Sequence, residues 1–183
     1  MHNITEYEAF AQRMEEKFPK MFVGKYGGFA CGKGWWPILE KLCDNIQHHI
    51  DWRNKQRDRE IELHAAYTSG YEALVKFYQG KSAEPSDWDE SKAQETLENG
   101  VEVPKEVRQV VVAQIKEKFG GLRFYYDGGD AEISGMVRMA EAWADVACEE
   151  CGGIGTRRDG SWIRTLCDVH EAEHQARKLK QDE

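Results

Sequence analysis

The stretch Cys148-Glu149-Glu150-Cys151-Gly152-Gly153, followed by Leu166-Cys167-Asp168-Val169-His170, decides how the C-terminal part of this chain can fold. A Cys-x-x-Cys pair followed by a Cys-x-x-His pair is the spacing of a closed tetrahedral zinc site with three thiolates and one imidazole. The glycines just past the second cysteine permit the positive φ that such a turn needs. We therefore predict a structural Zn²⁺ held by four residues, Cys148, Cys151, Cys167 and His170.

A second motif competes for one of these ligands. Residues 170–174 read HEAEH, the HExxH pattern in which two histidines hold zinc and a glutamate, here Glu171, activates water. Only nine residues follow His174, and no suitable third ligand precedes Asp182. Cys167 explains His170 better, although His174 as the fourth ligand stays open. A nucleobase deaminase would need an H-x-E element before its cysteine pair, and none fits.

The residues around the cysteines predict how the site is presented. Asp130 is placed to cap a helix whose apolar residues recur at intervals of three and four and which leads directly into Cys148. Between the two ligand pairs, Asp159-Gly160 is a turn signal. We expect a small hairpin closed by the metal, followed by a polar, frayed helix.

Upstream lies the strongest strand pattern of the chain. Residues 107–118 are rich in valine and isoleucine, residues 119–121 (FGG) offer a turn, and residues 122–126 alternate. This pattern predicts an antiparallel hairpin. One face is expected to carry Val111, Ala113, Ile115, Leu122, Phe124 and Tyr126, and the other Lys116, Lys118, Arg123 and Tyr125.

The N-terminal third should be helical around an irregular segment. Residues 5–18 have an amphipathic pattern, and residues 21–37 mix five glycines with aromatic residues, which predicts an ordered loop packed by Phe22, Tyr26, Phe29, Trp35 and Trp36. From Pro37 onward the spacing is helical, with a break expected near residues 68–70. The histidines of this region, His48, His49 and His64, are expected to be solvated.

Residues 80–100 differ in composition, with two lysines against six acidic residues and little apolar content. We expect a solvated, mobile surface loop here, or else an insertion that contacts a partner. A short helix could begin at Ser86.

Together these patterns predict an α+β fold, with helices packed on a small antiparallel sheet and a zinc-ribbon-like knuckle. We expect an α+β domain over residues 1–146 and a knuckle hairpin with a polar helix over residues 147–183. The formal charge of −8 over 183 residues disfavours binding to nucleic acid through phosphates. We find no apolar run that could span a membrane and no secretory signal, so a cytoplasmic location is expected. Cys31 and Cys43 should be reduced thiols.

Three stretches carry a resemblance to a known group. These are GKGWWPILEKLC (32–43), QIKEKFGGLRFYY (114–126) and the cysteine-rich tail, and together they resemble small uncharacterised proteins encoded by bacteriophages and prophages. The resemblance implies an accessory role in an infected bacterium, and inhibition of a host antiviral defence protein is one such role.

For function we favour a protein that acts by binding a host protein, because no convincing catalytic constellation accompanies the closed metal site. One alternative is sequestration of a nucleotide-like small molecule beneath the tryptophans, with arginines for the anion, through Trp35, Trp36, Arg123, Arg157, Arg158 and Arg164. Nucleic-acid binding by the knuckle and zinc hydrolysis through HEAEH are further alternatives. The sequence does not indicate the partner's identity or the oligomeric state.

Overall fold

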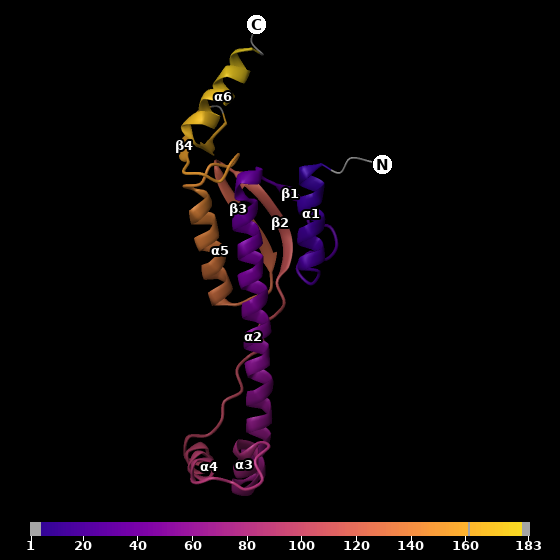
Figure 1. Cartoon of the computed structure of the whole chain (residues 1–183), viewed down its shortest axis with the longest axis vertical. Helices are drawn as coiled ribbons and strands as arrows, with labels where there is room; N and C mark the ends of the chain where they lie inside the picture. Colours follow the sequence, from indigo (N-terminus) through magenta and orange to yellow (C-terminus); the bar gives the residue numbers. More distant parts are fainter. Residues whose placement is uncertain (1–4, 161, 181–183) are drawn as a thin grey trace. The chain divides into compact units, whose positions relative to one another are not determined.

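The computed structural model describes residues 5–160 and 162–180 and has the expected α+β composition (Figure 1). The chain forms two compact units, one made of Met1–Ile50 with Arg108–Glu183 and the other of Asp51–Val107. The boundary expected between residues 146 and 147 lies inside the first unit. That residues 147–183 fold independently of residues 1–146 stays a prediction. Among the described residues, no helix is long and apolar enough to cross a membrane.

The first unit begins with helix α1, Glu6–Lys17, whose first turn is closed by a reciprocal capping box between Thr5 and Glu8. A short 3₁₀ turn, Lys33–Trp35, then leads into helix α2, Trp36–Ser69. The aromatic loop between them is packed as predicted. Its buried rings, together with α1 and the start of α2, build a core that includes Phe10, Met14, Met21, Phe29, Trp35, Leu39 and Ile46.

A three-stranded sheet lies in the same unit, in the order β1-β2-β3. The predicted hairpin is confirmed as β2, Val111–Lys118, paired antiparallel with β3, Gly121–Asp127. The third strand was missed: β1, Phe29–Ala30, pairs parallel with β2, within the segment predicted as an irregular loop. Two residues are too few to show a strand period, and this pairing joins segments distant in sequence.

The predicted faces of β2 need a correction. The register shifts between Val112 and Gln114, so Ala113 forms a bulge and the alternation changes phase there. Val112 and Ile115 are therefore the buried residues of the strand, whereas Ala113 is exposed. On β3 the prediction holds for Leu122 and Phe124, which are buried.

Helix α5, Ala131–Ala144, follows the sheet and is capped by Asp130 as predicted. Strands β4, Thr156–Arg158, and β5, Arg164–Leu166, form the expected second hairpin, and helix α6, Asp168–Leu179, follows. We refer to residues 147–170 as the Cys/His knuckle.

The second unit contains the later turns of α2, helix α3, Tyr71–Gln79, and helix α4, Asp87–Asn99. The helix break near residues 68–70 is confirmed. The loop expected over residues 80–100 is wrong for most of its length, because α4 begins at a capping box formed by Ser86 and Asp89. The acidic helix needs little apolar content, since it contributes Ala93 to the small buried core formed with Leu74 and Val75 and packs the partly buried Leu97 against it.

Candidate metal centre

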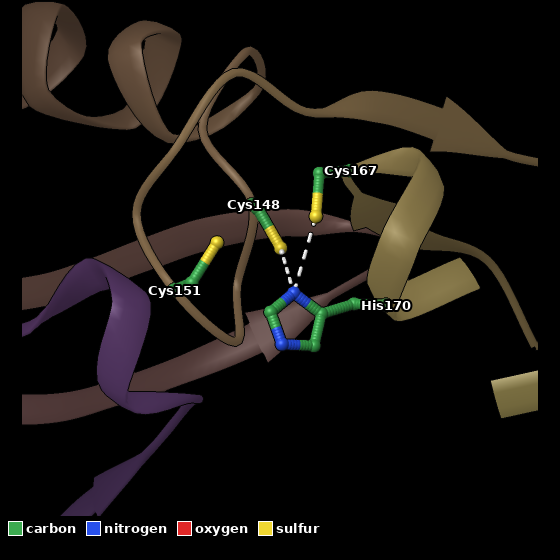
Figure 2. Close-up of side chains that lie close together, drawn as sticks. All are labelled: Cys148, Cys151, Cys167 and His170. Atoms are coloured by element: carbon green, nitrogen blue, oxygen red, sulfur yellow. Dashed lines mark hydrogen bonds between the residues drawn. The ribbon is translucent and has the colours of Figure 1, made fainter. Parts of the chain in front are cut away.

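The four predicted ligands lie together in the knuckle, although they come from three local structures (Figure 2). Cys148 follows α5, Cys151 lies in the turn after it, Cys167 is the N-cap of α6, and His170 lies in the first turn of that helix. Gly152 has φ +74°, the positive value predicted for this turn. Nδ1 of His170 is 3.5 Å from the Cys148 sulfur and 3.1 Å from the Cys167 sulfur.

These distances suit one tetrahedral ion. Bonds of about 2.3 Å to sulfur and 2.0 Å to nitrogen put neighbouring ligand atoms about 3.5 to 3.8 Å apart. In the knuckle the four ligand atoms lie within 4.8 Å of one another, so small adjustments would place all four on a single metal. Three sulfurs and one imidazole select a soft or borderline cation such as Zn²⁺.

The first cysteine is prepared for the thiolate form that a metal requires. Burial raises the pKa of Cys148, but backbone N–H groups of Cys167, Cys151 and Glu150 outweigh it and leave the pKa below its usual value. At Cys151 the Gly153 N–H lowers the pKa, yet desolvation and the neighbouring Cys148 sulfur prevail and raise it. A thiolate at Cys148 thus disfavours a second thiolate at Cys151, and a bound cation would compensate this repulsion.

Two glycines allow the N-terminal loop to reach the knuckle. Gly34 donates its N–H to the carbonyl of Glu149 at 2.8 Å, and Gly32 donates to the Glu149 carboxylate at 2.9 Å. A Cβ on Gly34 would lie 2.2 Å from the Cys148 carbonyl oxygen and 2.5 Å from the Gly152 nitrogen. Only glycine fits this approach. Burial raises the pKa of Glu149, which sequence reasoning missed because its partners lie more than a hundred residues away.

The β2–β3 turn holds the knuckle from another direction. The buried hydroxyl of Thr165 donates to the carbonyl of Gly120 at 2.7 Å, and the Glu149 N–H donates to the Thr165 carbonyl at 2.9 Å. A Cβ on Gly120 would lie 3.0 Å from the Ile163 side chain. Residues from 32–43 and from 114–126 therefore both meet the cysteine-rich segment at the knuckle.

The tryptophans proposed as a pocket wall are packing residues. Trp35 is fully buried, and its indole N–H donates to the carbonyl of Ala147 at 2.8 Å. Trp36 stacks on Phe10 with ring centroids 4.5 Å apart. Trp35 has no surface to offer a ligand, and it instead joins the N-terminal loop to the knuckle.

The four candidate arginines lie on strands. Arg123 is on β3 and donates to the carbonyl of its neighbour Leu122. Arg157 and Arg158 lie on β4 and Arg164 on β5, where Arg158 and Arg164 are register partners. The Arg158 guanidinium is already engaged by the Leu166 carbonyl and the Asp168 carboxylate. The structure does not gather these arginines around Trp35 and Trp36.

Helix α6 contains the whole HEAEH motif, and its two histidines differ in surroundings. His170 belongs to the Cys cluster, whereas His174 joins no group of three possible ligands within residues 5–160 and 162–180. A HExxH centre needs both histidines on one ion. The geometry therefore favours His170 as the fourth ligand of a closed site.

One histidine was misjudged from the sequence. His49, expected to be solvated, is only 7% exposed and lies between two carboxylates. Its Nε2 is 2.9 Å from Asp130 Oδ2, and its Nδ1 is 3.4 Å from Glu132 Oε2. The three groups could hold a metal ion. However, the two carboxylates face different ring nitrogens, so a metal bound at one nitrogen would lie close to only one of them.

An open apolar groove of about 640 Å³ lies beside the metal centre, between the first turns of α2 and the length of α5. Its α5 side presents Met139 and Trp143, which are 67% and 63% exposed. The α2 side contributes Ile38, Leu42 and Lys41. Lys41 is the one charged side chain among the described residues that line this α2/α5 groove.

Comparisons with protein-family models, with curated proteins and with solved structures find no match to this chain.

Proposed function

We propose that the knuckle binds one structural Zn²⁺ and that the protein acts by binding another protein. The observation that supports the metal is the convergence of three sulfurs and one imidazole nitrogen within 4.8 Å. Four protein ligands leave no position open for a metal-bound water. Such a site contributes folding energy, and here it would fix the surface against which the N-terminal loop and the β2–β3 turn pack.

Metal analysis of the purified protein tests the first part. We expect about one zinc per chain, and loss of the metal in Cys167→Ser and His170→Ala. Cys31→Ser, which alters a free cysteine outside the cluster, should keep its zinc. His170→Cys should also retain metal, because four thiolates form an equally closed site. A wild-type protein without metal, or a Cys167→Ser protein with full metal, would refute the assignment.

The α2/α5 groove is our candidate for the binding surface. Methionine has a flexible side chain that adapts to its neighbours, and tryptophan offers a large contact area. Both residue types are enriched at protein interfaces. Exposing both beside an open apolar hollow costs solubility, and binding a partner would give that exposure a function. Because Lys41 is the single charge in the lining and the described lining holds no carboxylate, the groove suits an apolar helix that carries an acidic residue.

The phage resemblance supplies the class of partner. We propose that the groove occludes a protein of host antiviral defence, in the cytoplasm of an infected bacterium. Small size and net charge of −8 are compatible with this role. In stable complexes a few central aromatic residues carry most of the binding energy.

Two exposed tryptophans allow a matched test. Trp143 lies in the groove and Trp162 lies outside its lining, with exposed fractions of 63% and 65%. Trp143→Ala should weaken capture of the defence protein by about 30-fold and remove protection of phage growth, since central aromatic contacts contribute about 2 kcal/mol or more. Trp162→Ala should leave both unchanged. If both substitutions weakened capture equally, or if neither did, the groove would not be the binding surface.

A further inference from the structure

Helix α6 carries an apolar stripe that is left uncovered within the described chain. Its members recur at intervals of three and four and are Val169, Ala172, Ala176 and Leu179. At about 100° per residue they fall within an arc of about 80°. All four are exposed, with Val169 at 65% and Leu179 at 70%, and no described residue of α6 is buried.

The stripe points away from the metal centre. His170, which faces the cysteine sulfurs, lies about 140° around the helix from the middle of the stripe. The partly buried residues of α6 are His170, Glu171 and His174, which lie together on the other side. The metal site therefore uses one side of α6, and the apolar stripe remains available on the opposite one.

Charge is divided along the same helix. Its first half carries Asp168, Glu171 and Glu173, and its C-terminal end carries Arg177, Lys178 and Lys180. A helix with this division complements a copy of itself that runs in the opposite direction.

We propose that α6 of one chain pairs antiparallel with α6 of a second copy. The stripe then matches itself, with Val169 opposite Leu179 and Ala172 opposite Ala176 of the other chain. Next to this seam Glu173 faces Lys180 of the other chain, and the two-fold symmetry of the dimer creates this pair twice. Parallel pairing would instead place Asp168 beside Glu173 of the other chain, which is a repulsive contact.

The interface is small, so the dimer is weak. A pair of helices of 12 residues buries much less than the roughly 1,600 Å² of a standard interface. Association is therefore expected to depend on concentration and to exchange rapidly. This self-association does not depend on the function proposed for the α2/α5 groove.

Sedimentation equilibrium of the full chain over about 10 μM to 1 mM tests the proposal. The wild type should change from monomer to dimer across this range. Glu173→Lys and Lys180→Glu should each raise the dimer dissociation constant about tenfold, because each replaces two attractive pairs with two repulsive ones. The double variant should return to within about twofold of the wild type, and Leu179→Glu should remain monomeric.

Glu171→Lys is the matched control, since it changes the net charge as Glu173→Lys does but lies away from the seam. It should leave the dissociation constant within about twofold of the wild type. Helix content by circular dichroism should be unchanged in every variant. A wild type that is monomeric at 1 mM, a double variant that fails to recover, or a Glu171→Lys effect equal to that of Glu173→Lys would overturn the proposal.

Discussion

Each of the two compact units of this protein is stabilised internally by different contacts. In the first, segments far apart in sequence meet at the Cys/His knuckle through close backbone contacts at Gly34 and Gly120. In the second, α3 and α4 pack around a core of three buried residues, Leu74, Val75 and Ala93. The first unit is therefore built on close backbone approaches at glycines around a candidate metal cluster, whereas the second depends on a small area of apolar contact.

In the second unit, the segment after α4 (residues 100–107) is fixed by side-chain hydrogen bonds from α2. Asn54 makes two hydrogen bonds of 3.0 Å with the backbone of Val107, and Arg57 donates to the Pro104 carbonyl. Such bonds compensate for the low apolar content of this stretch. Each hydrogen bond contributes about 1 kcal/mol. Because the core of this unit is small, the loss of even a few such bonds should destabilise it.

The largest effect should come from Gly34→Ala. The added Cβ would lie 2.2 Å from a backbone oxygen, which cannot move without displacing Cys148 from the cluster. We expect the free energy of unfolding to fall by about 3 kcal/mol or more, measured by urea denaturation of the zinc-loaded protein.

Gly135→Ala provides the control for this substitution. Gly135 lies inside α5, and an added Cβ would meet only the Arg138 side chain at 3.8 Å. Alanine should stabilise that helix by up to about 1 kcal/mol. A loss of stability equal to that of Gly34→Ala would contradict the contact argument.

Leu74→Ala should break the second unit selectively. The side chain is fully buried in the small core, and its truncation should cost about 2 to 4 kcal/mol. Hydrogen exchange should show the loss in α3 and α4, while α5 and the β2–β3 hairpin keep their protection. Equal loss in both units would mean that they unfold as one.

His49→Ala should lower the stability of the first unit by about 1 to 2 kcal/mol at neutral pH, because it removes the partner of two carboxylates. His48→Ala, at the exposed neighbouring position, should change it by less than about 0.5 kcal/mol.

The acid limb of the stability curve gives a second measurement. Burial raises the pKa of Asp130, but hydrogen bonds from His49 and from the Ile133 N–H outweigh it and hold the pKa below its usual value. Ionised Asp130 therefore stabilises the fold above its unfolded pKa of about 3.9, and this contribution is lost as the pH falls through the folded pKa. In His49→Ala the loss below about pH 4 should be smaller. An equal loss of stability in the wild type and in His49→Ala below about pH 4 would contradict the link between His49 and Asp130.

The smallest effect is expected at the tip of the β2–β3 hairpin. Phe119 is exposed and has φ +55°, followed by Gly120 at φ +78°, which is the pattern of a type I′ turn. Asparagine tolerates this conformation better than phenylalanine. Phe119→Asn should therefore raise the free energy of unfolding by about 1 kcal/mol, and a decrease would show that the ring contributes a contact.

Local patterns in the sequence predicted much of this structure. The cysteine spacing, the capping residue Asp130 and the hairpin around FGG all act over a few residues, so each can be recognised without knowledge of the fold. The four ligands were identified for the same reason, and the structure favours His170 over His174.

What could not be predicted depends on distant partners. The burial of His49 follows from the position of Asp130, and β1 exists only because β2 lies beside it. The bulge at Ala113 shifts a strand face without any glycine to signal it. The five glycines of residues 21–37 predicted an ordered loop, but the approach of Gly32 to Glu149 and of Gly34 to Cys148 required the folded chain.

The proposed dependence of the first unit on zinc can be measured directly by hydrogen exchange of the full chain before and after zinc chelation. After chelation, amides of the knuckle, the β2–β3 turn and residues 32–35 should lose protection, while amides of α3 and α4 keep theirs. Unchanged exchange at the knuckle, or equal loss of protection in α3 and α4, would contradict this dependence.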